Sequence, residues 1–379
     1  MALGEFDWIA RLHKAFPQTS GAILGMGDDC AVLPFSALTC DSGGNASDDE
    51  LLVSTDLLTE GVHFRLEDLT PWQLGWKSLA VNISDIAAMG GTPKGFFLSI
   101  AFPIPEETDQ ADSARLDEAW MDEYIRGLKD IADAYGITLL GGDTSRSDGP
   151  LTINITILGT CGKGRSVKRS AARPGDLICV SGTLGDSAAG LKALLENKGS
   201  ENANPSMKGA SNAFDGSLAR LVHRHFEPMP RVALGRALAA MPGMGAMMDL
   251  SDGLAADLPH ILEASGPASG VSSERFQAQD SASLGAVIEV DKIPLSEDLR
   301  AVCAEYGWDA LSLALEGGED YELLFTCRPD APLERIQPPN APSASTDGIP
   351  ALTVIGRVTS TPGLIWKGSD RSFNGFRHF

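Results

Sequence analysis

The hydrophobic pattern of roughly the first 160 residues changes between helical and extended spacing. In three segments apolar residues recur at helical spacing, and a proline or glycine follows each segment. They predict helices over Glu5–Phe16, Trp72–Met89 and Ala111–Tyr135. Strands are predicted in AVLPF, in LLVSTD, over Phe96–Phe102, and in ITLLGGDT and LTINITILG, where the last segment alternates cleanly. This half of the chain therefore mixes helices with strands.

The second half repeats strand and helix patterns after a basic stretch. Strands are predicted over Leu177–Ser181, Ala286–Val290, Glu322–Thr326 and Leu352–Ile355, with helices beginning near Asp186, Pro230, Asp252 and Ser296. This order indicates an α/β or α+β fold. The basic stretch over Gly162–Pro174 suggests a boundary between two domains, 1–163 and 164–379. Three segments rich in small and polar residues, 197–216, 266–283 and 329–350, are expected to be surface inserts.

Charge and composition restrict the class of partner. The 379 residues include 51 Asp and Glu against 30 Lys and Arg, a net charge of −21. Such a field repels polyphosphates, so we expect no nucleic-acid partner and expect phosphorylated ligands to arrive with metal cations. The N-terminus lacks a secretory pattern, and no apolar run reaches the roughly 20 residues that cross a bilayer. We expect a cytoplasmic protein without a membrane partner, whose six scattered cysteines are reduced core thiols.

Aspartates recur at the ends of predicted elements, among glycine and apolar residues. They are Asp28, Asp29, Asp56, Asp85, Asp143, Asp249 and Asp252. Desolvating a carboxylate without a partner is costly, so a bound cation would explain such positions. Any single one is more often a helix N-cap or a turn residue. Their repetition favours a cation site, and oxygen ligands without a His or Cys cluster favour Mg²⁺.

Trp76–Met89 contains a polar stripe made of Ser78, Asn82 and Asp85, one helical turn apart. A solvated face would hold Lys and Glu instead. Two readings stay open: a buried hydrogen-bond network between helices, or a functional stripe. By contrast, His223 and His225 are expected on a helix surface.

The usual nucleotide-binding loops are missing. GTCGKGRS lacks the spacing of a Walker A loop, and GMGDDC lacks the third glycine of a dinucleotide loop. GGDT, SGTLGDSAAG and SDGLAAD each place small residues before a predicted helix start, where backbone N–H groups can meet phosphate. Ordinary tight turns with Asp caps fit each of them equally well.

A series of motifs along the chain resembles one enzyme family. In order they are GEFDWIARL, GMGDDCAVL, VSTDLLTEGVHF, GWKSLAVNISDIAAMGG, LLGGDTSR, KRSAARPGD, SGTLGDSAAGL, RHFEPMPRV, MDLSDGLAADLPHI and GGEDYELLFT. The series resembles the thiamine-monophosphate kinases, within the superfamily of PurM-like ATP-dependent synthetases. The resemblance implies a two-domain PurM-like fold of α/β and α+β class, with a mixed N-terminal sheet, a C-terminal α+β domain and a homodimer.

The resemblance also assigns roles to particular positions. Magnesium ligands are implied at Asp29, Ser54, Thr55, Asp56, Asp85, Asp143, Asp249 and Asp252. ATP contacts are implied at Gly142, Asp143, Arg169 and Ser251, and thiamine monophosphate contacts at His63, Glu319 and Phe373, with Trp366 as an alternative to Phe373. Asp85, Asp143 and Arg169 are the expected catalytic residues, acting through several Mg²⁺ ions and Arg169 as counter-charges.

The activity that the resemblance implies is phosphorylation of thiamine monophosphate to thiamine diphosphate, with ATP as co-substrate and direct in-line transfer. Two alternatives stay open. One is another ATP-dependent synthetase of the superfamily, such as aminoimidazole ribonucleotide synthetase. The other is a non-catalytic nucleotide-binding regulatory protein, although the completeness of the aspartate set speaks against it.

Overall fold

The computed structural model describes residues 11, 15, 49–103, 116–197, 216–266, 284–336 and 349–375. Asp29, the strand predicted in AVLPF and most of the three predicted inserts lie outside these residues. Of the helix predicted over Glu5–Phe16, only residues 11 and 15 are described, and both are helical.

The first sheet has four strands in the order β1-β4-β2-β3. They are β1 (Glu50–Thr59), β2 (Thr92–Pro103), β3 (Thr138–Ser147) and β4 (Thr152–Cys161). β4 runs antiparallel to both β1 and β2, whereas β2 and β3 are parallel, so the sheet is mixed as expected. Every second residue of β4 from Ile153 to Ile157 is buried, which explains the alternation in its sequence.

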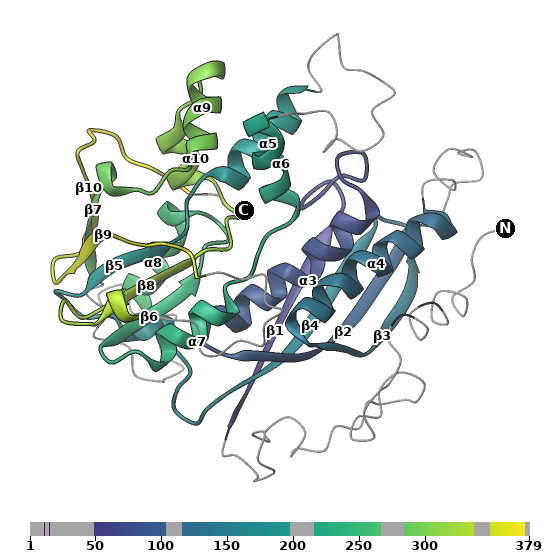
Figure 1. Ribbon diagram of the computed structural model, residues 1–379, viewed down its shortest axis with the longest axis horizontal. Helices are drawn as coiled ribbons and strands as arrows, with labels where there is room; N and C mark the ends of the chain where they lie inside the picture. The colour runs from purple at the N-terminus through teal and green to yellow at the C-terminus, as the bar shows by residue number, and fades with distance from the viewer. Residues whose placement is uncertain are drawn as a thin grey trace.

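Two helices, α3 (Pro71–Ala88) and α4 (Glu118–Tyr135), cover one face of this sheet (Figure 1). α3 begins with a capping box between Thr70 and Gln73 and has proline in its first turn. α4 begins at the N-cap Asp117 and ends at Gly136, whose φ of 64° is left-handed. The helix predicted over Ala111–Tyr135 thus begins later than expected, because Asp117 accepts from the backbone N–H of Trp120.

The second sheet has six strands in the order β10-β7-β9-β5-β8-β6. The strands are β5 (Leu177–Ser181), β6 (Met244–Asp249), β7 (Gly285–Glu289), β8 (Leu323–Cys327), β9 (Leu352–Thr359) and β10 (Gly363–Lys367). Only the β10–β7 pair is parallel. Sequence reasoning did not identify β6 or β10.

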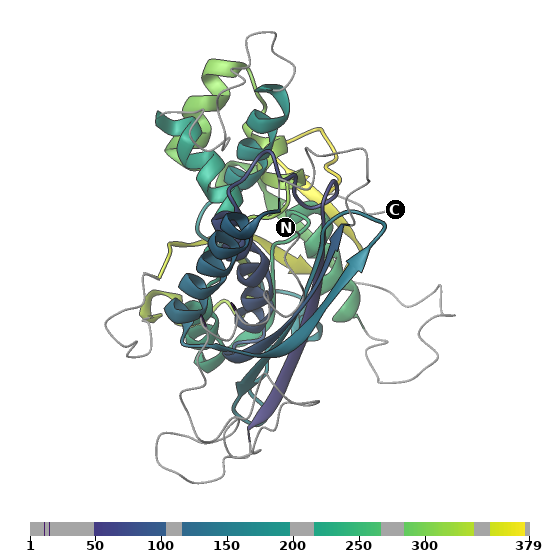
Figure 2. The same cartoon turned by 90° about the vertical axis from the view of Figure 1, so that its right-hand side faces the viewer.

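Within the described residues, six helices belong to the second domain. Figures 1 and 2 show them beside the second sheet. They are α5 (Asp186–Asn197), α6 (Gly216–Phe226), α7 (Val232–Ala240), α8 (Leu254–Ala264), α9 (Glu297–Tyr306) and α10 (Ala310–Glu316). Short 3₁₀ turns occur at Arg169–Ala171, Val290–Lys292 and Leu333–Arg335. The two sheets with their helices confirm the mixed α/β and α+β class.

The strands of the first sheet come from residues 50–161 and those of the second from 177–367. On this basis we propose the domain boundary predicted above, between 163 and 164. The two parts meet where α3 packs on α7 and β6. Trp76 Nε1 donates to the carbonyl oxygen of Pro228 at 3.0 Å, and the hydroxyl of Tyr135 donates to that of Pro230 at 2.9 Å. The segment between α6 and α7 thereby joins the two domains.

The described helices include none with the length and apolar character that crossing a bilayer requires. Four cysteines fall within the described residues, namely Cys161, Cys179, Cys303 and Cys327, and all four are buried free thiols. The expectation that His225 lies on a helix surface is wrong. α6 turns it inward against Phe226 and the neighbouring α5, and its side chain is buried.

Candidate active site

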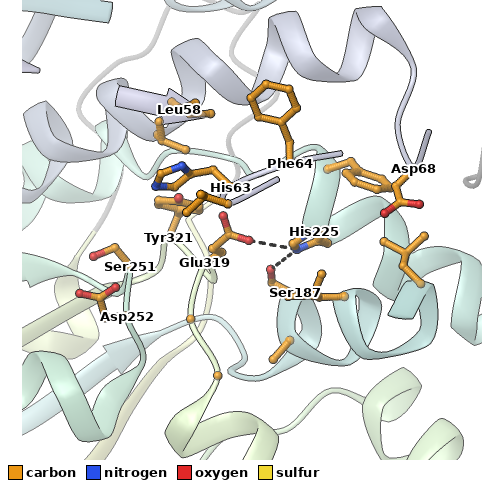
Figure 3. A pocket seen from close by; sticks show the side chains of 18 of the residues that line it. Leu58, His63, Phe64, Asp68, Ser187, His225, Ser251, Asp252, Glu319 and Tyr321 are labelled. Carbon is orange, nitrogen blue, oxygen red and sulfur yellow. Dashed lines mark hydrogen bonds and ion pairs between the residues drawn. The ribbon is translucent and has the colours of Figure 1, made fainter. Parts of the chain in front are cut away.

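A cavity of about 690 Å³ lies between the two domains. The N-terminal domain contributes β1, the loop after β1 and two residues of α3. The C-terminal domain contributes α5, α6 and the segments around residues 249–252 and 316–321 (Figure 3). Seven predicted site residues line it: Asp56, His63, Asp85, Asp249, Ser251, Asp252 and Glu319. Positions far apart in the sequence thus gather around one hollow.

Glycines bring two loops of the C-terminal domain into contact at the floor of this cavity. The loop after β6 runs beside the loop before β8, so that Glu319 N donates to Ser251 O at 2.8 Å. A Cβ atom on Gly318 would stand 2.4 Å from the same carbonyl oxygen, and one on Gly253 would stand 2.6 Å from that of Gly317. Only glycine permits so close an approach. The glycines of SDGL and GGED therefore hold Ser251, Asp252 and Glu319 together.

The backbone of the second loop is strained. Glu319 and Tyr321 have φ values of 63° and 50°, in the left-handed region that side chains rarely adopt. Backbone hydrogen bonds to Ser251 and Leu250 maintain this conformation. Such strain persists where surrounding contacts impose it, and it is frequent at functional sites. Both side chains face the cavity.

Three carboxylates, of which Asp249 is buried and Asp56 and Asp85 are half-buried, have raised proton affinities. Burial, followed by the charges of Asp85 and Asp249, raises the pKa of Asp56 to about 7. Burial and the charge of Asp85 likewise raise the pKa of Asp249 to about 7. Burial raises the pKa of Asp85 as well, although the hydrogen bond from Ser54 and the charge of Arg169 act in the opposite direction. The three groups form an electrostatic cluster that a cation would stabilise.

Neighbouring hydroxyl groups orient two of these carboxylates. Ser54 Oγ donates to Asp85 Oδ2, and Ser84 Oγ donates to Asp249 Oδ2 at 2.6 Å. Ser54 extends from the same face of β1 as Asp56, because residues two apart on a strand share a face. Arg169, in the 3₁₀ turn after the first domain, lowers the pKa of both Asp85 and Asp249 through its charge.

The fit of this cluster to Mg²⁺ depends on how many protein ligands the ion needs. Within the described residues no three His, Cys, Asp or Glu side chains converge closely enough to hold a metal ion by themselves. Mg²⁺ keeps several waters and is commonly bound by one or two carboxylates together with substrate phosphates. The pairs available among Asp56, Asp85 and Asp249 fit that mode of binding and do not fit an all-protein cage.

Glu319 takes part in a buried ionic contact that crosses between the domains. Its Oε2 lies 3.1 Å from Lys77 Nζ on α3. The same oxygen lies 3.2 Å from His225 Nδ1 on α6 (Figure 3). Burial alone would raise the pKa of Glu319, but the charge of Lys77 and its hydrogen bond hold that pKa below its ordinary value. Burial also lowers the pKa of His225 to about 3, so its imidazole is neutral. Ser187 Oγ lies 3.0 Å from the same Nδ1.

His63 lies at the end of β1 with one ring nitrogen already engaged. The backbone N–H of Thr59 donates to His63 Nδ1 at 3.0 Å. Nδ1 therefore carries no proton, and in the neutral ring the proton is on Nε2. The ring lines the cavity near Glu319 and Tyr321 (Figure 3). His63 can thus offer an N–H donor to an anion bound there.

The polar stripe on α3 divides into two parts. Ser78 and Asn82 are fully buried. Ser78 Oγ contacts the hydroxyl of Tyr124 on α4 at 3.2 Å, and Asn82 Nδ2 donates to Ser78 O at 3.0 Å. Asp85 lines the cavity instead. A hydrogen bond between helices is therefore confirmed for Ser78, whereas Asn82 bonds to the backbone of its own helix and its buried Oδ1 has no hydrogen-bond partner among the described residues. A functional role stays a prediction for Asp85.

Other predicted site residues lie away from the cavity lining. Gly142 and Asp143 are exposed on β3, where a Cβ on Gly142 would stand 1.7 Å from the carbonyl oxygen of Leu98. Thr55 is exposed on the outer face of β1. Phe373 is only 5% exposed and packs edge-on against Trp366, with ring centroids 5.2 Å apart. A single chain does not bring these four predicted residues into the cavity.

Sequence reasoning missed Lys77, His225 and the α5 face of the cavity. A signal existed for Lys77, because GWKSLA places the one basic residue of this helix among Trp, Leu and Ala. Its side chain is 1% exposed, which for lysine implies a charged partner. No comparable local signal marked Leu191 and Leu195, since they become cavity residues only through the place of α5 in the tertiary structure.

Comparison with known proteins defines the class first. Residues 27–161 match the family model of the AIR synthase related protein, N-terminal domain. The second sheet and its helices follow this domain along the chain, which gives a two-domain architecture. A hydrogenase maturation protein of E. coli, HypE, shares the fold, with a TM-score of 0.67 at 20% identity.

Closer similarities identify the family. The chain is 39% identical to the thiamine-monophosphate kinase of Escherichia coli strain K12 over 86% of this chain and 83% of that protein. The crystal structure of thiamine-monophosphate kinase from Stenotrophomonas maltophilia K279a is 32% identical and covers 98% of this chain and 99% of its own, with a TM-score of 0.68. The structure of AaThiL complexed with AMPPCP and TMP is 31% identical, and its TM-score is 0.67. The match covers 100% of this chain and 97% of the AaThiL chain. The chain belongs to the thiamine-monophosphate kinase family, and it is a kinase.

Proposed function

We propose that this protein transfers the γ-phosphoryl group of ATP to the phosphate of thiamine monophosphate, giving thiamine diphosphate and ADP. The observation that carries the proposal is the convergence of Asp56, Asp85 and Asp249 on the cavity that also presents His63 and Glu319. A related structure with an ATP analogue and TMP bound supports both substrates.

The acceptor needs little activation. A phosphate monoester has its second pKa near ~6 and is largely ionised at neutral pH, so no strong general base is required. Transfer then depends on alignment of the two phosphates and on neutralisation of their charge. We assign direct in-line transfer without a covalent enzyme intermediate.

The carboxylate cluster is suited to Mg²⁺. Asp56, Asp85 and Asp249 would hold the ions, and Ser54 would keep Asp85 oriented. Bound Mg²⁺ supplies positive charge that neutralises the phosphates of ATP and of the acceptor. The protein's own residues then orient the reactants: His63 offers Nε2–H to phosphate, Arg169 supplies fixed positive charge, and Glu319 faces the cationic ring of the acceptor.

The exposed residues of β3 also enter the proposal. Gly142 and Asp143 lie at the opposite edge of the first sheet from β1. We assign them to ATP and metal binding on the family resemblance, together with Ser251 and Asp252 in the cavity. Thr55 and Phe373 keep their proposed roles on the same basis, although neither lines the cavity.

We further propose a homodimer. Among the strands that the structure describes, β1 lies at one edge of the first sheet, and its outer face exposes apolar side chains, with Leu51 43% and Val53 59% exposed. Apolar side chains at a sheet edge favour association with another chain. Light scattering of the full chain should give twice the monomer mass, and Val53→Asp should shift the mass toward the monomer. The cytoplasmic location stays a prediction of the sequence.

The test is a panel of phosphorylated acceptors incubated with the full chain, ATP and Mg²⁺, with products identified by mass. We expect thiamine diphosphate and ADP in equal amounts, formed only with thiamine monophosphate and lost on chelation. Asp85→Asn and Asp143→Asn should each abolish most of this activity. ADP release without any preference among acceptors would contradict the assignment, and a product from another acceptor would favour a different synthetase.

A further inference from the structure

The contact between Lys77 and Glu319 suggests a role beyond stability. Lys77 lies in the middle of α3, is 1% exposed, and reaches across the domain boundary to a carboxylate that lines the cavity. Removing an ammonium group from water is expensive, and many buried ion pairs can be replaced by apolar residues without loss of stability. The stability of the fold alone therefore does not explain the ion pair between Lys77 and Glu319.

The geometry makes the two oxygens of Glu319 unequal. Lys77 Nζ and His225 Nδ1 both contact Oε2, and Oε1 takes part in neither contact. The left-handed backbone at Glu319, with φ of 63°, fixes the direction in which its side chain leaves the loop. The groups facing the carboxylate are thus Lys77 from α3, His225 from α6, His63 from the loop after β1, and Tyr321 from its own loop. Figure 3 shows Glu319 between His63 and His225.

We propose that Lys77 is a positioning residue that holds Glu319 so that its Oε1 meets the positively charged ring of the substrate. The inference rests on the proposed function, since thiamine monophosphate carries a cationic thiazolium ring. Lys77 itself does not face the ligand, because its side chain is buried beneath the carboxylate. The nearest charge that a ligand in the cavity meets here is therefore negative, and the site prefers a cation to a neutral ring of equal size.

The experiment compares two phosphate-free ring compounds as inhibitors of the kinase. One is an N-methylated hydroxyethylthiazolium cation, and the other is the same hydroxyethylthiazole without the N-methyl group, which is neutral. Wild-type protein should be inhibited more strongly by the cation, by about tenfold or more. Lys77→Met should reduce the ratio of the two inhibition constants, neutral compound over cation, toward one. It should also raise KM for thiamine monophosphate about tenfold, while kcat changes by less than about threefold.

Three further variants make the result specific. Lys77→Arg keeps a positive charge and should retain most of the preference for the cation. Glu319→Gln should abolish the preference, and adding Lys77→Met to it should have no further effect on the ratio. Lys129→Met removes a surface lysine paired with Asp133 on α4 and should match the wild type. If Lys77→Met does not fold, Lys77→Gln, which keeps an N–H donor without charge, gives the same test.

Two outcomes separate failure of this inference from failure of the proposed function. If wild-type protein phosphorylates thiamine monophosphate but Lys77→Met keeps the cation preference and KM, the positioning role is wrong and the function stands. A fall in kcat of Lys77→Met, with KM and the ratio of the two inhibition constants unchanged, would also contradict the positioning role. If wild-type protein releases no ADP with thiamine monophosphate, the proposed function itself fails.

Discussion

Replacing Asp249 by Asn should stabilise the metal-free protein and at the same time inactivate it. Asp249 is 4% exposed at the end of β6 and shares its surroundings with Asp85 and Asp56. Asparagine keeps an oxygen that can accept the hydrogen bond from Ser84 Oγ, so the substitution removes mainly the charge. The Asp249→Asn variant therefore separates the electrostatic role of this side chain from its packing.

The magnitude follows from the pKa of Asp249, which burial and Asp85 raise from 3.8 to about 7. The folded state thus holds the proton more tightly than the unfolded state. Ionising Asp249 therefore destabilises the folded state. This loss of folding free energy is absent below pH 3.8, grows as the pH rises toward 7, and is complete above pH 7. Between pH 5 and 7 it amounts to about 3 kcal/mol at about 1.36 kcal/mol per pH unit. The coupled carboxylates share this energy, so about 1–3 kcal/mol is expected for one substitution.

The assay is thermal unfolding in buffer with a chelator at pH 5 and pH 8. The melting temperature of Asp249→Asn should exceed that of the wild type at pH 8 by several degrees, about 2–4 °C per kcal/mol, and the excess should be clearly smaller at pH 5. Asp143→Asn is the matched control, because Asp143 is exposed on β3 and outside the cluster. Equal stability of Asp249→Asn and wild type at both pH values would refute the electrostatic account.

Three other outcomes are expected. Mg²⁺ should raise the wild-type melting temperature more at pH 8 than at pH 5, since cations bind the ionised cluster; equal shifts would argue against binding there. Gly318→Ala, whose Cβ would stand 2.4 Å from Ser251 O, should lower both melting temperature and activity, whereas Gly149→Ala, with no contact under 3.4 Å, should change neither. Ser78→Ala leaves the buried hydroxyl of Tyr124 without this partner and should cost about 1–3 kcal/mol in denaturant unfolding, without changing KM.

Local patterns in the sequence were sufficient for much of the fold. α3 and α4 have strong apolar periodicity and end at glycines, and β4 alternates strictly, so each was predicted within a few residues except for the start of α4. β6 and β10 were missed for a physical reason. β6 (MGAMMD) contains Gly, Ala and Asp, which are depleted in strands, and β10 (GLIWK) has only three consecutive apolar residues between glycine and lysine, so neither shows a clear strand pattern.

The candidate site was predicted in part, because its carboxylates occur where an unpaired charge would be costly. That argument identified Asp56, Asp85 and Asp249 without any knowledge of their distances. It could not identify His225, whose role depends on α6 packing against α5. It also placed Asp143 with the others, although β3 carries it on an exposed part of the first sheet. Side-chain chemistry is visible in a sequence, whereas the face on which a strand end lies depends on tertiary structure.

The helix α3 shows how one segment can combine folding and function. Ser78 and Asn82 connect it to α4 and to its own backbone, while Lys77 contacts Glu319 and Asp85 lines the cavity from the same helix. Since residues seven or eight apart lie on one face of a helix, Lys77 and Asp85 face the second domain together. One helix thus sets the position of Glu319, which we assign to the cationic ring, relative to Asp85, which we assign to the metal. A shift of α3 would therefore misplace both ends of the substrate at once.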